Sequence, residues 1–204
     1  GFTREELVAR AREVRRVTGR IGLVSTAVCD HPEIDGIVDD LSAMDYEVSV
    51  ASLRLDDLTP QFVFKLADTG VQGLTLAPEC GSDRMRRIIN KQFTNAEILD
   101  KATWIFENGI QNLKLYYMIG LPTETDEDLE GIGHLAQDVI GAYFSVPKNV
   151  RARGLRVTCS ASSFVPKPFT PFQWFGQDTH DQIVEKQTKL RDILHKVKGV
   201  NFNY

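Results

Sequence analysis

Cysteine is scarce in this sequence, with three residues at positions 29, 80 and 159 of 204. They lie 51 and 79 residues apart, so no pair has the close spacing of a redox dithiol or of a zinc ribbon. Histidine is also rare, and the neighbouring Asp30 and His31 are too few for a metal site. We therefore expect buried, apolar cysteines and no metal ligands in this chain.

Other classes are excluded by further absences. No apolar run approaches the roughly 18 residues of a membrane span, and no signal peptide is present. Acidic residues outnumber basic ones by 28 to 24, which disfavours a broad nucleic-acid surface but not a local basic site. No GxGxxG or P-loop pattern follows any predicted strand. These features predict a single cytoplasmic domain with no membrane partner.

Alternating strands and helices are what the sequence does contain. Apolar segments predict strands at 21–28, 47–53, 73–77, 112–119 and 155–164, and 200–204 has a strand-like alternation. Helical spacing separates them, with Thr3/Glu6 and Thr94/Glu97 as capping boxes and a long helix at 125–144. Strands that are each followed by a helix predict a parallel sheet with outer helices. Both an open sheet and a partial barrel fit, and the missing nucleotide motifs favour the barrel.

The functional site of such a sheet lies at the carboxyl ends of its strands. The run Glu79-Cys80-Gly81-Ser82 sits at one such end and combines a carboxylate, a flexible glycine and a helix-capping hydroxyl. A hydroxyl-rich ligand such as a ribose needs these groups. Alternatively, Glu79 pairs with Arg84 or Arg86, and Ser82 is only a cap.

Two other strand ends carry candidate ligand residues. Arg54 follows the second strand and suits a carboxylate, although Asp56 and Asp57 offer a surface ion pair instead. The run 119–122, Ile-Gly-Leu-Pro, lets backbone approach a planar ligand, or it is an ordinary turn into a helix capped by Thr125. The aromatic segment 164–175 predicts either a lid over the barrel mouth or a packing loop.

Two of these motifs resemble the radical S-adenosylmethionine (SAM) enzymes. The stretch 74–91, with Glu79-Cys80-Gly81-Ser82 and a later Ile-Asn-Lys, is similar to their fourth-strand motif. The stretch 118–125, with Gly-Leu-Pro-Thr-Glu-Thr, resembles their fifth-strand motif, and the two occur in the family's order. The segments 52–54 and 164–168 resemble the branch that often carries an upstream cobalamin-binding domain.

The resemblance implies a partial (β/α)6 TIM-like barrel with SAM across its strand ends. It also implies a [4Fe-4S] cluster, a flavodoxin or ferredoxin as electron donor, and reductive cleavage of SAM to a 5′-deoxyadenosyl radical. The substrate and the catalytic residues stay unknown. The residues implied in SAM binding are Ser52, Arg54, Glu79, Ser82, Ile119, Gly120 and Leu121.

The sequence departs from the family at the cluster. These enzymes hold it with a CxxxCxxC loop after the first strand, because iron needs thiolates gathered in one short loop. No such loop is present, and Ser25-Thr26-Ala27 stands near the place of a Gly-Gly-Glu that often ends the second strand. We therefore expect residues 1–204 to be the carboxyl-terminal part of the barrel, with strands two to six and no first strand. Such a fragment is expected to be inactive.

Two other functions stay open at this point. One is a phosphate- or sugar-handling α/β barrel in which Glu79 is an acid or base and Arg54 binds an anion. The other is a ligand- or partner-binding module that kept the barrel and lost its cluster.

Overall fold

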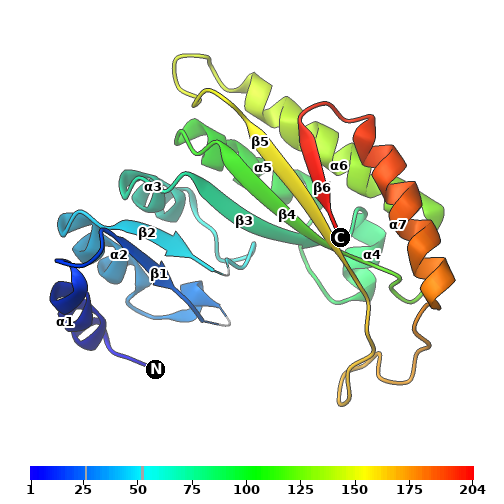
Figure 1. Ribbon diagram of the computed structural model, residues 1–204, viewed down its shortest axis with the longest axis horizontal. Helices are drawn as coiled ribbons and strands as arrows, with labels where there is room; N and C mark the ends of the chain where they lie inside the picture. The colour runs from blue at the N-terminus through cyan, green and yellow to red at the C-terminus, as the bar shows by residue number, and fades with distance from the viewer. Residues whose placement is uncertain (26, 52) are drawn as a thin grey trace.

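In the computed structural model, residues 1–25, 27–51 and 53–204 are described, so the predicted ligand residue Ser52 lies outside the described part. Strands and helices alternate along the chain, as predicted (Figure 1). The strands are β1 (Arg20–Leu23), β2 (Glu47–Val50), β3 (Gly73–Glu79), β4 (Asn112–Ile119), β5 (Arg156–Ser163) and β6 (Val200–Asn203). The helices are α1 (Arg4–Val14), η1 (Val28–Asp30), α2 (Ile34–Ala43), α3 (Pro60–Asp68), α4 (Asp83–Ile88), α5 (Asn95–Glu107), α6 (Asp126–Ser145) and α7 (His180–His195).

Every strand pair of the described part is parallel. β1 pairs with β2, while β3, β4, β5 and β6 form a four-stranded sheet in that order. The alternating segment at 200–204 forms β6, which pairs with β5 from Val157↔Val200 to Ser160↔Asn203. Among the described residues no ladder joins β2 to β3, so the parallel strands form two sheets rather than one. The α/β class with parallel strands and outer helices is confirmed.

The first two strands are shorter than the sequence pattern predicts. β1 ends at Leu23 and β2 at Val50, so the prediction of strand is wrong at 24, 25, 27, 28, 51 and 53, and positions 26 and 52 lie outside the described residues. Val24 is exposed, whereas Val28 turns into η1 and is buried with Ile34 and Val38 in the main core. A 3-10 turn therefore buries the apolar residue that would otherwise have extended the strand.

One face of the larger sheet is covered and the other is open. Side chains along β3, β4 and β5 alternate between buried and accessible. Figure 1 shows α5 and α6 behind this sheet, and no described helix crosses in front of β3, β4 and β5. The buried strand residues pack in the core with α5 and α6; they include Leu74, Leu76, Leu113, Leu115, Val157 and Cys159. Parallel sheets are ordinarily covered on both faces, so an accessible face marks a place for a ligand or partner.

Local capping fixes where the helices begin. Both predicted capping boxes are present, with Thr3 and Glu6 at α1 and Thr94 and Glu97 at α5. Each hydroxyl satisfies a backbone amide that has no partner inside the helix. Among the described helices, none has an apolar stretch that could cross a membrane.

Candidate functional site

A cavity of about 270 Å³ lies where the chain leaves β2, at the carboxyl end of β3 and beside β4. Because β2 and β3 are not paired, this is also where the two sheets separate. The cavity is lined by Ala51, Leu53, Arg54, Leu55, Asp56, Thr75, Ala77, Glu79, Lys91, Phe93 and Tyr116. Two predicted ligand residues from separate strand ends, Arg54 and Glu79, therefore share one cavity.

Glu79 ends β3 in a backbone conformation that side chains rarely adopt. Its φ is +64°, and the β3–β4 ladder shifts register between Leu76 and Glu79. The side chain faces the cavity, with one carboxylate oxygen (Oε1) 3.4 Å from Nζ of Lys91. The alternative of a pair with Arg84 or Arg86 is therefore replaced by a pair with Lys91. A left-handed residue that is not glycine costs about 1 kcal/mol, so this position keeps strain in order to present a carboxylate.

Arg54 both forms the surface ion pair and faces the predicted ligand site, the two alternatives that the sequence left open. Its guanidinium pairs with Asp57 at 3.2 Å and with Asp56 at 3.5 Å, and about half of the side chain is exposed. The same side chain lines the cavity. Exposed ion pairs of this kind contribute about 0–1 kcal/mol, so a ligand carboxylate can replace Asp56 and Asp57 at little cost.

The turn after β3 is fixed by contacts with α6. Ser82 caps α4 by accepting a hydrogen bond from the Met85 amide at 3.1 Å, and its hydroxyl donates to Asp128 at 2.5 Å. A Cβ added at Gly81 would lie 2.2 Å from the Ile132 nitrogen and 2.5 Å from the Asp128 carbonyl oxygen. Gly81 thus serves close packing against a helix backbone, and Ser82 does not line the cavity.

Arg86 holds the same turn from its other side. The side chain is fully buried and donates to the carbonyl oxygens of Cys80 at 2.5 Å and Phe93 at 3.1 Å. It also pairs with Asp83 at 2.5 Å and bonds the side chain of Asn95. A buried cation is tolerated only when paired and hydrogen-bonded, and Arg86 meets both conditions.

The turn after β4 is buried and packs against α7. Ile119 and Leu121 are almost completely buried, and neither they nor Gly120 line the cavity. The Gly120 amide donates to Glu124 at 2.8 Å, and Glu124 pairs with Lys186 of α7 at 3.0 Å. Contact of residues 119–121 with SAM therefore stays a prediction, while their local role is to join β4, α6 and α7.

The carboxylates behind the two turns have pKa shifts of opposite sign. Burial raises the pKa of Asp128, but hydrogen bonds from Arg84, Ser82 and Thr125 outweigh burial and bring the pKa below 3.8. For Glu124, burial dominates and raises the pKa above 4.5, although the Gly120 amide and Lys186 oppose the rise. The surroundings of the first carboxylate thus favour its anion, whereas burial disfavours the anion of the second.

The cysteines do not provide a cluster site. Cys80 and Cys159 are buried, and burial raises the pKa of each thiol to about 12. Cys29 is half-buried, and burial raises its pKa as well. Across residues 1–25, 27–51 and 53–204, no three His, Cys, Asp or Glu side chains are placed to hold a metal ion. Since iron–sulfur clusters need gathered thiolates, the residues present do not fit a [4Fe-4S] cluster.

The aromatic segment after β5 is partly packed and partly free. Phe164, Phe172 and Phe175 stack edge to face with ring centroids 6.1 Å and 5.3 Å apart. Phe169 and Trp174 are almost fully exposed. The packed rings agree with a packing loop, and a lid role for the exposed rings stays a prediction.

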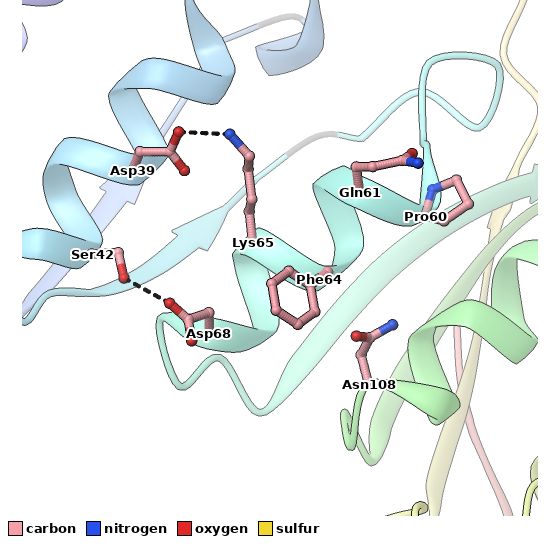
Figure 2. A pocket seen from close by; sticks show the side chains of 8 residues that line it. All are labelled: Asp39, Ser42, Pro60, Gln61, Phe64, Lys65, Asp68 and Asn108. Carbon is pink, nitrogen blue, oxygen red and sulfur yellow. Dashed lines mark hydrogen bonds and ion pairs between the residues drawn. The ribbon is translucent and has the colours of Figure 1, made fainter.

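A larger hollow of about 570 Å³ lies among α2, α3 and the residue after α5. Its polar side chains already have partners, as Figure 2 shows: Lys65 pairs with Asp39 (2.6 Å), and the Ser42 hydroxyl donates to Asp68 (3.3 Å). None of its lining residues belongs to a strand. Because parallel α/β sheets bind ligands at strand ends, the smaller cavity is the better candidate site.

Sequence reasoning missed residues that shape the cavity. Lys91 is the third residue of the Ile-Asn-Lys run, so the motif itself contained the signal for it. Tyr116 lies in a strand recognised only as apolar, and its alternation with buried Leu115 and Tyr117 would have placed it on the open face. Asp128 had no such signal, because it contacts a turn 46 residues away, and Arg86 was considered only as a partner of Glu79.

A family model described as the radical SAM superfamily matches residues 2–136. An uncharacterized protein of Methanocaldococcus jannaschii is 30% identical over 202 residues, which cover 98% of this chain and 42% of that protein. The chain thus spans less than half the length of this relative.

Solved structures show the same fold at low identity. Streptococcus suis SuiB bound to SAM matches with a TM-score of 0.62 and 11% identity, over 100% of this chain and 44% of SuiB. Methanocaldococcus infernus Elp3 matches with a TM-score of 0.63 and 11% identity, over 97% of this chain and 51% of Elp3. Methylornithine synthase (PylB) matches with a TM-score of 0.56 and 13% identity, over 99% and 61%.

Proposed function

Because the chain belongs to the radical SAM superfamily, we propose that the protein cleaves SAM reductively and uses the resulting radical on a substrate. In that chemistry one electron enters SAM, the sulfur–carbon bond to the 5′ carbon breaks, and methionine and a 5′-deoxyadenosyl radical form. The radical then takes a hydrogen atom from the substrate and becomes 5′-deoxyadenosine. A flavodoxin or ferredoxin is the proposed electron donor. The cavity that brings Arg54 and Glu79 together is the observation that carries the proposal.

The donor set of the cavity suits the charged end of SAM. A guanidinium binds a carboxylate in a two-pronged geometry, which assigns Arg54 to the SAM carboxylate. Glu79 accepts hydrogen bonds from ribose hydroxyls or from the SAM ammonium group, and Lys91 holds its carboxylate in place. Ser82 acts indirectly by capping α4, since its hydroxyl is bonded to Asp128.

The cluster has to be held by residues outside this chain, because the described cysteines do not fit it. We place β1–β5 as barrel strands two to six, with β6 as a further strand beside β5 and the cysteine loop on another segment of the natural protein. The 164–168 segment supports membership of the branch that often has a cobalamin-binding domain. On this proposal the isolated 204-residue chain binds SAM weakly and does not cleave it.

The test compares the protein as naturally encoded with the 204-residue chain. Both are purified without oxygen, supplied with iron and sulfide, and incubated with SAM and dithionite. We expect the natural protein to be brown and to release 5′-deoxyadenosine, detected by liquid chromatography, and the 204-residue chain to release none. Calorimetry is expected to give at least about tenfold weaker SAM binding for Glu79→Gln and Arg54→Gln in the natural protein.

The matched control is Glu107→Gln, which removes an exposed carboxylate at the end of α5 and leaves SAM affinity unchanged. A natural protein that contains no iron and yields no 5′-deoxyadenosine would overturn the proposal and favour a cluster-less binding module. Tight SAM binding by the 204-residue chain would contradict the assignment of missing ligands. Catalysis of phosphate or sugar chemistry without SAM would favour the alternative barrel enzyme.

A further inference from the structure

Most charges on the accessible face of the strands are paired. Arg20 of β1 pairs with Glu47 of β2 at 3.0 Å, and Glu79 pairs with Lys91 at 3.4 Å. Two cations on the same face, Lys114 and Arg156, are not paired in this way. Neither Lys114 of β4 nor Arg156 of β5 has a carboxylate within 4.0 Å among the described residues. The open face of the larger sheet therefore carries uncompensated positive charge.

Strand register puts these two cations on one face of the sheet, two positions apart along neighbouring strands. Asn112 is the partner of Arg156, and Lys114 is the partner of Thr158, so all four side chains project from the open face. In a parallel sheet, residues two apart on one strand and their neighbours on the next share a face. Lys114 and Arg156 also line a common hollow of about 220 Å³ with Thr75 and Thr158.

Lys114 extends from this hollow toward the SAM cavity. Its Nζ atom lies 4.5 Å from the centre of the Tyr116 ring, in a cation–π contact. Tyr116 is 42% exposed and also lines the cavity of Arg54 and Glu79. The ammonium group thus contacts a ring that also lines the cavity of Arg54 and Glu79, on the same accessible surface.

Neutral hydrogen-bonding groups surround the two cations. Across the open face, the ladder places Ser160 beside Tyr116, Asn201 beside Thr158, and Asn203 beside Ser160. A second hollow, which shares Arg156 and Thr158, adds Arg191, also without a carboxylate partner among the described residues. Hydroxyls and amides beside cations are the groups that bind carboxylate or phosphate oxygens.

We propose that the substrate of the radical reaction is an anion, with its carboxylate or phosphate held by Lys114 and Arg156 on the open face of β3–β6. This inference rests on the proposed function for the reaction, but the anion site itself depends only on the sheet face. A cationic substrate would meet uncompensated like charge. A neutral one would leave two cations unpaired under a bound ligand, which is costly once water is excluded.

The test measures chemical acetylation of individual lysines in the naturally encoded protein by mass spectrometry. The probes are inorganic pyrophosphate and citrate, with glycerol as a neutral control and sodium chloride to hold ionic strength constant. A bound anion is expected to slow acetylation of Lys114 about tenfold at ten times its dissociation constant. Lys148, an exposed lysine after α6, is expected to react at the same rate throughout.

Variants test the second cation. Arg156→Gln is expected to raise the anion concentration that protects Lys114 about tenfold, whereas Lys148→Gln has no effect. Protection by pyrophosphate alone identifies a phosphate ligand, and protection by citrate alone identifies a carboxylate ligand. Protection by both anions shows that the site accepts either group. No protection by either anion, or equal protection by sodium chloride, overturns the proposal.

SAM affinity separates this inference from the proposed function. Lys114→Gln and Arg156→Gln are expected to leave SAM binding unchanged, because neither residue lines the cavity of Arg54 and Glu79. If anions protect Lys114 but the protein does not bind SAM, the proposed radical reaction is contradicted and the anion site is supported. If the protein binds SAM but anions do not protect Lys114, only the anion-site proposal is contradicted.

Discussion

The turns after β3 and β4 are built from similar parts and differ in what they present. Each has a left-handed residue at the end of its strand, Glu79 with φ +64° and Gly120 with φ +78°, and the second turn has another at Thr123 with φ +69°. Each is also bonded to a carboxylate at the start of α6, Asp128 or Glu124. After β3, the left-handed residue carries a charged side chain into a cavity. After β4, it has no side chain, and Asp178 occupies the space beside it. At the strand end itself, the strained residue therefore keeps its side chain after β3, where it lines the cavity, whereas glycine avoids the strain after β4.

The largest effect is expected for Gly81→Ala in the first turn. The new Cβ would meet backbone atoms of α6 at 2.2 Å and 2.5 Å, and backbone cannot move aside as a flexible side chain can. We expect a loss of about 3 kcal/mol in the free energy of unfolding, measured by urea denaturation. Gly141→Ala in α6 is the control, since nothing lies within 4 Å of its Cβ and it should gain up to about 1 kcal/mol. Equal stability of the two variants would show that the first turn is not rigidly packed.

A smaller loss is expected for Gly120→Ala in the second turn. Its Cβ would lie 2.8 Å from Oδ2 of Asp178, a side chain that can shift, and the left-handed backbone adds about 1 kcal/mol. The total is expected to be about 2 kcal/mol by the same measurement. In an Asp178→Ala background the steric part should disappear. If the loss there is undiminished, Asp178 is not what requires glycine at this position.

Replacing Glu79 by glycine separates stability from binding. Removal of the left-handed strain is expected to leave the free energy of unfolding unchanged or to raise it by up to about 1 kcal/mol. SAM affinity of the natural protein is expected to fall at least about tenfold, because the carboxylate is lost. Asp45→Gly relieves a similar φ of +57° at an exposed site and should leave SAM affinity intact. A destabilised Glu79→Gly variant would mean that the Lys91 pair outweighs the strain.

The smallest effects are expected in the pH dependence of stability, with opposite signs for the two turns. The pKa of Asp128 is lowered in the folded state, so its contribution is present above pH 3.8 and is lost as pH falls through the folded pKa. The pKa of Glu124 is raised, so its contribution declines as pH rises from 4.5 through the folded pKa. Stability relative to Asp128→Asn should therefore rise with pH, and stability relative to Glu124→Gln should fall. Parallel slopes in the two comparisons would contradict the distinction between the turns.

Short-range features of the fold could be predicted from the sequence, and long-range pairings could not. The alternation of β3 and the Thr94/Glu97 capping box depend on neighbours within a few residues. Ser82 and Asp128, by contrast, are 46 residues apart and meet only when α6 packs on the turn. The run 84–87, Arg-Met-Arg-Arg, has the composition of a solvated basic helix, yet Arg86 is fully buried. Its burial depends on carbonyl oxygens from a turn that no local pattern specifies.

The bonds of Arg86 also have a consequence for the kinetics of opening. α4 has only six residues, a length at which a helix frays easily on its own. Arg86 connects it to the backbone of Cys80 and Phe93 and to Asn95 at the start of α5. Amide hydrogens of α4 should therefore exchange with solvent at the slow rate of the α5 start, as one cooperative unit. The segment between α4 and α5, whose Lys91 and Phe93 line the cavity, would then be among the last parts of this chain to unfold.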